Sequence, residues 1–388
     1  MTLPIGAHAA SPTAEALVAR RIRADVQAMH AYAVQDPQGM VKLDAMENPY
    51  RLSAELQSAL GARLGAVALN RYPGVRVQHL RDALAQYAHM PAGYDIILGN
   101  GSDELISLLS LACAVGTDRL TCKPPVVLAP VPGFVMYAMS AQLQGLDFVG
   151  VPLTPDFALD VPAMLAAIAQ TQPAIVYLAY PNNPTANLWN EADMAQVVAA
   201  ASQSGSLVVL DEAYQPFSSR SYLDAIRAQP QLHTHVLLMR TLSKFGLAGV
   251  RLGYLMGPQA LVAELEKVRP PYNISVLNCE CALFALEHAE AFAAQAQAIC
   301  EERARLLQAL RQLPGLQVWS SDANMILVRV PARAGQDAAQ AVFESMRARS
   351  VLVKNVSKMH PLLADCLRLT VGTADENTQL LAALKASL

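Results

Sequence analysis

Short apolar runs alternate with longer segments of helical periodicity between residues 94 and 257. The runs are too short for helices and end at polar or turn-forming residues, which is typical of buried strands. This alternation predicts an α/β fold in which a mostly parallel, seven-stranded sheet lies between helices. The candidate strands are residues 96–98, 126–129, 148–151, 174–179, 207–210, 236–239 and 252–256.

The pattern changes after Pro270-Pro271, which either forms a hinge or simply ends a helix. We expect one long helix over residues 276–313, and then a smaller α+β domain. Its candidate elements are strands at 323–330 and 367–371 and a helix at 337–350. The expected domains are an N-terminal arm and helix that packs on the small domain (1–42), a large domain (43–272) and the small C-terminal domain (273–388).

Composition excludes several classes of partner. Hydrophobic residues make up 53% of the chain and charged residues 16%, so a large buried core is expected. The net charge of −3 gives no reason to expect nucleic acid or an anionic membrane as a partner. No run of about 18 apolar residues and no secretory signal is apparent, so we expect a cytoplasmic protein. No metal is expected, because none of the six cysteines forms a C-x-x-C pair; they are Cys113, Cys122, Cys279, Cys281, Cys300 and Cys366.

Lys244 is the most informative polar residue. It ends Thr241-Leu242-Ser243-Lys244, directly after a candidate strand, and Arg251 follows seven residues later. Ligands of α/β proteins bind at the carboxyl ends of parallel strands. Lysine forms Schiff bases, hydroxyl groups bind phosphate, and arginine grips phosphate with two N–H groups. In isolation Lys244 would be an ordinary surface charge, but its neighbours favour an anionic, carbonyl-bearing ligand.

Polar residues follow three further candidate strands. Asp211 ends one strand, and as a buried carboxylate it would need a cation such as a protonated pyridine nitrogen; a helix cap or a metal ligand is the alternative. Asn183 lies in a proline-bounded loop that is either a turn or an amide donor to a ligand. In Gly99-Asn100-Gly101-Ser102, the last residue is expected to cap a helix whose free N–H groups bind an anion.

Together these segments resemble the fold-type-I pyridoxal-phosphate enzymes, in the branch that contains aspartate aminotransferase. The likeness is strongest to the histidinol-phosphate aminotransferases and covers nearly the whole chain from about Ala24. Seven ordered motifs carry it: Leu43-Asp44-Ala45-Met46-Glu47-Asn48-Pro49-Tyr50, Asn70-Arg71-Tyr72-Pro73, Pro181-Asn182-Asn183-Pro184-Thr185, Asp211-Glu212-Ala213-Tyr214, Arg240-Thr241-Leu242-Ser243-Lys244, Ser321-Asp322-Ala323-Asn324 and Leu367-Arg368-Leu369-Thr370-Val371-Gly372-Thr373.

The resemblance implies pyridoxal 5'-phosphate as the cofactor and assigns roles around it. Lys244 would form the imine, and Asp211 would bind the pyridine N–H. Tyr214 and Asn183 would hold the phenolic oxygen of the ring, and Phe134 would stack on its face. The cofactor phosphate would be bound by Ser102, Asp103 (through its backbone), Thr241, Ser243, Arg251 and, from the neighbouring subunit of a homodimer, Tyr72.

The same resemblance implies a substrate site in which Arg368 and Asn324 bind the anionic group. A phosphate monoester carries more charge than a carboxylate, so we expect Arg329 and Lys354 to join Arg368, although both could be surface charges. Asn48 and Tyr50 would lie on the side of this site that receives the imidazole ring of the substrate.

The chain departs from the pattern at Ala186, where the family loop usually has Gly, and at Phe134, where the stacking residue is often Tyr. An alanine is expected at position 186 only if its φ is negative. The ring of Phe134 suffices for stacking.

The implied reaction is amino transfer between histidinol phosphate and 2-oxoglutarate, which gives imidazole acetol phosphate and glutamate in histidine biosynthesis. A broad aromatic or 2-oxoacid aminotransferase and a same-fold threonine-phosphate decarboxylase remain alternatives. A pyridoxal-phosphate-binding transcription regulator would need a DNA-binding domain, and the roughly 40 residues before Asp44 lack a basic helix-turn-helix pattern.

Overall fold

The computed structural model describes residues 13–29, 36–114, 123–332 and 337–388, and the chain divides into two compact units, Met1–Gln38 and Gly39–Leu388. The described part of the first unit contains two short helices, α1 (Ala14–Arg21) and α2 (Ala24–Ala28). The hydroxyl of Thr13 caps α1 by accepting the N–H of Ala16 at 3.2 Å. Cys122 lies outside the described residues.

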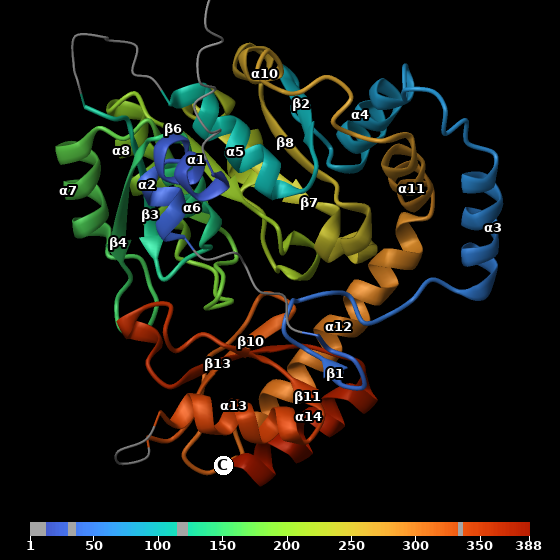
Figure 1. Cartoon of the computed structure of the whole chain (residues 1–388), viewed down its shortest axis with the longest axis vertical. Coiled ribbons are helices and arrows are strands. Elements are labelled where there is room, and N and C mark those ends of the chain that lie inside the picture. The colour runs from blue at the N-terminus through green and yellow to red at the C-terminus, as the bar shows by residue number, and fades with distance from the viewer. Residues whose placement is uncertain (1–12, 30–35, 115–122, 333–336) are drawn as a thin grey trace, which may run out of the picture. The chain divides into compact units, whose positions relative to one another are not determined.

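A seven-stranded sheet forms the centre of the second unit (Figure 1), in the order β2-β8-β7-β6-β5-β3-β4. Strands β3 to β7 are mutually parallel, whereas β8 runs antiparallel to both of its neighbours. All seven strands predicted from the sequence are confirmed. Their bounds are β2 Tyr94–Gly99, β3 Val126–Val131, β4 Asp147–Pro152, β5 Ile175–Ala179, β6 Leu207–Asp211, β7 Val236–Thr241 and β8 Gly253–Pro258.

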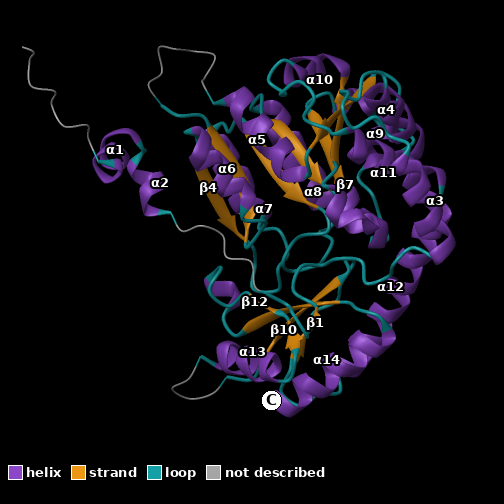
Figure 2. Cartoon of the chain, turned by 45° about the vertical axis from the view of Figure 1, so that its right-hand side comes forward, coloured by secondary structure: helices purple, strands orange, loops and turns teal. Residues whose placement is uncertain are grey.

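The inner strands are apolar because helices cover both faces of the sheet (Figure 2). Alternate residues of β6 separate the two cores: Val208 and Leu210 face one, and Val209 faces the other. The first core contains side chains of α4 Arg76–Tyr87, α7 Val161–Thr171, α8 Glu191–Gln203, α9 Leu223–Ala228 and α11 Val276–Glu287. The second contains side chains of α5 Ser102–Cys113, α6 Met136–Gln144 and α10 Gln259–Glu266. Helix α3 (Ala54–Gly65) packs against α11.

A four-stranded antiparallel sheet, ordered β12-β13-β10-β9, carries a third core together with three C-terminal helices. Two short strands, β1 and β11, pair in parallel beside it. The bounds are β1 Val41–Lys42, β9 Gln317–Val318, β10 Met325–Arg329, β11 Val351–Leu352, β12 Lys354–Asn355, β13 Cys366–Thr370, α12 Ala289–Leu310, α13 Ala338–Ala348 and α14 Ala374–Ser387. Single helical turns are η1 Gln215–Phe217, η2 Pro230–Leu232, η3 Ser243–Leu247, η4 Ala248–Val250 and η5 Pro361–Leu363.

Two expectations are wrong, one about a long helix and one about the backbone of Ala186. The single helix predicted over residues 276–313 is broken at His288, whose ψ of 33° separates α11 from α12. Ala186 has a positive φ of 63°, opposite to the expected sign. Its backbone is fixed from both sides, because its N–H donates to the carbonyl of Asn182 and its carbonyl accepts from the N–H of Asp322, each at 2.8 Å. These contacts hold an alanine in a conformation that glycine adopts more readily.

None of the helices in the described parts of the chain is long and apolar enough to cross a membrane.

Candidate active site

A cavity lies at the carboxyl ends of β5, β6 and β7, beside the start of α5. This is the edge at which the chain reverses its direction across the sheet, since β4 lies on one side of β3 and β5 on the other. Ten of the residues predicted to bind the cofactor line this cavity. The lining residues are Met46, Ser102, Asp103, Phe134, Ala179, Pro181, Asn183, Asp211, Ala213, Tyr214, Thr241, Ser243, Lys244 and Arg251.

Lys244 lies in the π-helical turn η3, which follows β7 directly. Its Nζ donates a 2.9 Å hydrogen bond to the backbone carbonyl of Ala45. Burial, supported by the positive charges of Arg368 and Arg251, lowers the pKa of Lys244 to about 8, although Glu47 opposes the shift. A substantial fraction of this amine is therefore neutral near physiological pH, as a nucleophile or a general base requires.

Asp211 is buried at the end of β6 with two neutral donors. The phenol of Tyr137 donates to its Oδ2 at 2.6 Å, and the N–H of Ala213 donates to its Oδ1 at 3.0 Å. Among the described residues, Asp211 forms no ion pair. Burial raises the pKa of its carboxyl group to about 6, and the bond from Tyr137 opposes that rise. A cationic ligand group beside Asp211 would supply the charge that this carboxylate lacks.

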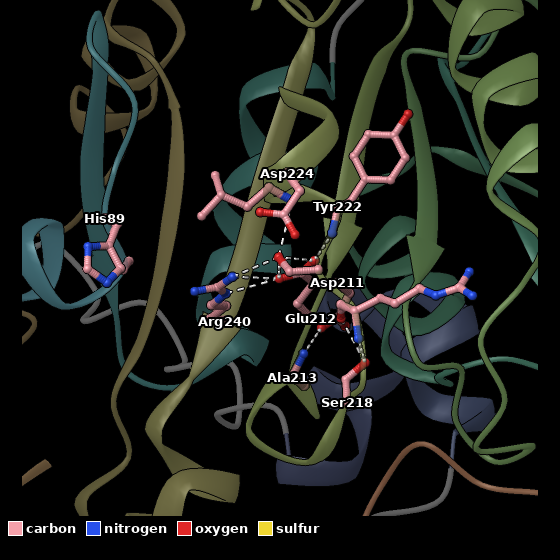
Figure 3. A network of polar contacts seen from close by, with 12 residues as sticks. His89, Asp211, Glu212, Ala213, Ser218, Tyr222, Asp224 and Arg240 are labelled. Atoms are coloured by element: carbon pink, nitrogen blue, oxygen red, sulfur yellow. Dashed lines mark hydrogen bonds and ion pairs between the residues drawn. The ribbon is translucent and has the colours of Figure 1, made fainter. Parts of the chain in front are cut away.

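Glu212, the next residue, belongs to a separate buried network (Figure 3). Its Oε2 accepts from Nη2 of Arg240 at 2.8 Å, and its Oε1 accepts from the N–H of Tyr222 at 2.6 Å. Ser221 Oγ donates to Oε1 of Glu212 and accepts from Nη2 of Arg240, each at 3.0 Å. The pair joins the ends of β6 and β7, and so connects the residues next to Asp211 and Thr241.

A group of hydroxyls and one guanidinium lines another side of the cavity. Thr241 Oγ1 donates to Ser243 Oγ at 3.0 Å, and Arg251 Nη1 donates to the same hydroxyl at 3.3 Å. Arg251 also forms an ion pair with Asp103 at 3.3 Å. These groups, together with the free N–H groups at the start of α5, are suited to an anion such as phosphate.

Ser102 is not the N-cap of α5, contrary to expectation. Gly101 takes that position with a φ of 82°, and Ser102 is the first helical residue. A Cβ on Gly101 would approach Arg251 Nη2 to 2.7 Å, and one on Gly253 would approach the Ser102 nitrogen to 2.7 Å. Glycine is required at both positions because β8, Arg251 and the start of α5 come so close together.

Arg368, on β13, does not line the cavity itself but contacts one of its lining residues, Asn183. Its Nη1 donates to Asn183 Oδ1 at 2.7 Å, and its Nη2 donates to the carbonyl of Asp44 at 2.8 Å. Since Asn183 uses its oxygen for Arg368, its amide NH₂ is the group that can bind a ligand. Asn324 donates to the carbonyl of Met46 at 2.9 Å, while its buried Oδ1 accepts no hydrogen bond from the described residues.

Lys354 and Arg329 occupy different places on the small sheet. Lys354 lies directly opposite Arg368 in the ladder between β12 and β13, so both side chains leave the same face. Arg329 lies opposite Cys366, outside the cavity lining. Its guanidinium donates to the carbonyls of Leu362 and Ala364 at 2.7 and 3.0 Å, and it lies over the ring of Trp319. These contacts fix the chain around Arg329, and the prediction that it binds substrate finds no support in them.

The three remaining predicted residues also lie outside the cavity lining, as do Arg368, Asn324, Lys354 and Arg329. Tyr72 is 73% exposed and stacks on Tyr272, with 4.1 Å between the ring centroids. Asn48 donates to Gln295 at 2.9 Å and, through its Oδ1, accepts from the N–H of Tyr50 at 2.9 Å. Tyr50 lines a second pocket together with Gly246 and Phe292.

Two contacts at the site were not anticipated from the sequence, those of Tyr137 with Asp211 and of Ala45 with Lys244. Tyr137 lies in the first turn of α6, whereas Phe134 precedes that helix, and no spacing in the sequence marked Tyr137 as a partner of Asp211. The contact of Ala45 uses a backbone carbonyl, for which no side-chain pattern exists.

Comparison with known proteins extends this description. Residues 38–384 match the family model "Aminotransferase class I and II". A histidinol-phosphate aminotransferase of Polaromonas naphthalenivorans is 68% identical, over 95% of this chain and 96% of the relative, and one of Paracidovorax citrulli is 66% identical, over 95% and 97%. The fold is similar to that of histidinol-phosphate aminotransferase from Sinorhizobium meliloti in complex with pyridoxal 5'-phosphate, with a TM-score of 0.77 and 24% identity over 95% of this chain and 97% of that one. The cavity lined by the buried Lys244 and Asp211 thus lies in a chain that belongs to the class I and II aminotransferases.

Proposed function

We propose that the chain is a histidinol-phosphate aminotransferase that uses pyridoxal 5'-phosphate. The observation that carries this proposal is the cavity that both Lys244 and Asp211 line, in a chain 68% identical to a protein of that activity. When bound, the cofactor supplies a carbonyl group and a pyridinium ring that accepts electrons. Asp211 would hold the ring N–H, because this buried carboxylate forms no ion pair with the described residues and so fits a protonated pyridine.

The phosphate of the cofactor would be held beside α5. Thr241, Ser243, Arg251 and the N–H groups that follow Gly101 offer hydroxyl, guanidinium and amide donors on one side of the cavity. The close approach around Gly101 and Gly253 brings these donors together. The phenolic oxygen would be bound by Tyr214 and the amide of Asn183, and Phe134 would cover one ring face.

Lys244 would bind the cofactor carbonyl and act on the substrate. Its neutral amine can accept the proton from the substrate carbon that bears the amino group, and return it later. The carbonyl of Ala45, which accepts a hydrogen bond from Nζ, would orient it for this transfer. The second substrate, 2-oxoglutarate, would then take up the amino group.

The phosphate of histidinol phosphate would lie against Arg368 and Lys354. Their pairing across β12 and β13 places two positive charges side by side, which suits the nearly double charge of a phosphate monoester better than a carboxylate. Asn324 would add a polar contact, and Asn48 and Tyr50 would lie on the side of the imidazole.

We also propose a homodimer whose active sites are shared. Tyr72 and Tyr272 form an exposed aromatic stack away from the cavity, and further large apolar side chains are exposed nearby in sequence: Leu69, Val75 and Leu277. A second copy that covered this surface would bury it and could bring Tyr72 to the phosphate of the partner's cofactor. A cytoplasmic location is proposed with it, supported by the five described cysteines, all of which are free.

Steady-state assays of the purified enzyme with one donor at a time test this function. With 2-oxoglutarate as acceptor, glutamate formation should have a higher kcat/KM for histidinol phosphate than for phenylalanine. A preference for phenylalanine would instead indicate a broad aromatic aminotransferase. Release of CO₂ from threonine phosphate, in place of amino transfer, would indicate a decarboxylase.

A further inference from the structure

Tyr137 contacts the active site from α6, which packs on one face of the large sheet, although it belongs to none of the motifs that carry the resemblance. It lies near the start of α6 and is only 2% exposed. Its phenol donates the 2.6 Å hydrogen bond to Oδ2 of Asp211. The bond joins side chains 74 positions apart in the sequence, so only the packing of α6 on the sheet brings them together.

The register of the sheet explains why these two residues meet. Tyr177 of β5 pairs with Val209 of β6, and Ala179 pairs with Asp211. Paired residues of parallel strands, and those two positions further on, point to one face of the sheet. Val209 and Tyr177 belong to the core that contains α5 and α6, so Asp211 leaves the sheet on the same side as α6.

Two aromatic neighbours hold the ring of Tyr137 in place. Tyr177 stacks on it with 4.3 Å between centroids and an interplanar angle of 8°. Phe134 meets it edge to face at 5.6 Å and 86°. Tyr137 thus touches both Asp211 and Phe134, the two side chains proposed to contact the cofactor ring at its nitrogen and on its face.

We propose that Tyr137 is a positioning residue that keeps Asp211 ionised and oriented for the cofactor ring, an inference that rests on the proposed function. Its hydroxyl and the N–H of Ala213 each occupy one carboxylate oxygen, and so fix the plane of the carboxylate. Each oxygen retains a lone pair, which leaves room for the pyridinium N–H.

The surroundings of Asp211 make this donor important. Among the described titratable groups, those that interact with Asp211 besides Tyr137 are Asp103 of α5, Tyr177 of β5 and, on its own segment, Glu212 and Tyr214. The cations Lys244 and Arg251 line the same cavity but form no ion pair with Asp211, and the two carboxylates raise the pKa of Asp211 further. Tyr137 and the Ala213 N–H are the groups that lower it. Desolvation raises the pKa of Tyr137 itself well above its usual value, so its phenol keeps its proton and remains a donor.

The test is Tyr137→Phe, which removes the hydroxyl and retains the ring between Tyr177 and Phe134. Binding of pyridoxal 5'-phosphate to the apoenzyme is measured by absorbance or fluorescence between pH 5.5 and 8.5, as the ratio of variant to wild-type dissociation constants. Losing a hydrogen bond to a charged acceptor should raise the pKa of Asp211 by about one unit. The ratio should therefore be about 10 at the acidic end and fall to within about 2-fold of unity at the alkaline end. The ratio cancels titration of the cofactor, which is common to both enzymes.

Tyr177→Phe is the matched control, because its hydroxyl is not among the donors to Asp211. Its ratio should be independent of pH. A Tyr137→Phe ratio that is equally large at every pH, up to complete loss of binding, would show a purely structural role and overturn the inference. A ratio of one throughout would overturn it as well. If wild-type enzyme bound no cofactor, the proposed function itself would fail, and the two failures are thereby distinguished.

Discussion

The buried pair of Glu212 and Arg240 should be among the most sensitive points in the molecule (Figure 3). The side chain of Glu212 is fully buried, and that of Arg240 is 8% exposed. Replacing Arg240 by Met removes two donors at 2.8 and 3.1 Å and leaves the carboxylate with Ser221 and the N–H of Tyr222 alone. A buried charge that loses its partner costs about 3–5 kcal/mol, so the free energy of unfolding should fall by that amount.

Urea unfolding followed by far-ultraviolet circular dichroism measures this change. The surface pair Lys267–Glu264 is the matched control, with both side chains about two-thirds exposed and 2.6 Å between the charged atoms. Lys267→Met should cost less than about 1 kcal/mol. The double variant Arg240→Met, Glu212→Gln should recover part of the loss, because no uncompensated charge remains. A cost for Arg240→Met as small as that for Lys267→Met would refute the reasoning.

Four further predictions concern the active site. Asp211→Ala should lower kcat by several orders of magnitude, because the pyridine ring loses its counter-charge; near-normal turnover would make Asp211 structural only. Lys354→Met should lower kcat/KM about 10- to 100-fold for histidinol phosphate and less for phenylalanine, so an equal loss on both donors would exclude a contact with phosphate. The rate at which apoenzyme combines with pyridoxal 5'-phosphate should rise about 10-fold per pH unit and level off near pH 8, since the pKa of Lys244 is lowered to about 8; a rise that continues to pH 10 would contradict that value. Mixing an inactive Tyr72 variant with Lys244→Ala should restore activity through heterodimers, whereas no recovery, given proven subunit exchange, would count against shared sites.

The sequence predicts the large sheet well because its inner strands are covered on both sides. Each inner strand is then a continuous apolar run, such as Val208-Val209-Leu210, and the polar residue that ends β6 marks the site. The two-residue strands β1, β9, β11 and β12 have no periodicity and were not predicted. The break at His288 was missed because apolar residues recur at helical spacing on both sides of it.

The site is predictable where a motif carries the chemistry, and less so where tertiary packing does. Asp211 ends β6 and Lys244 lies just after β7, and these positions together with the neighbouring residues marked both as candidates. Tyr137 reaches Asp211 only through the packing of α6, which a linear pattern does not contain. Arg329 carries a charge that suits phosphate, yet its guanidinium donates to the carbonyls of Leu362 and Ala364, contacts that the sequence does not reveal.

Reduction of the cofactor-loaded enzyme with borohydride, followed by peptide mapping, tests the central claim most directly. The wild-type chain should carry one reduced pyridoxal phosphate group, attached at Lys244, and Lys244→Ala should fold and carry none. Lys267→Ala, which changes an exposed lysine, should leave the labelling intact. Stoichiometric attachment to any lysine other than Lys244 would contradict the account of this active site.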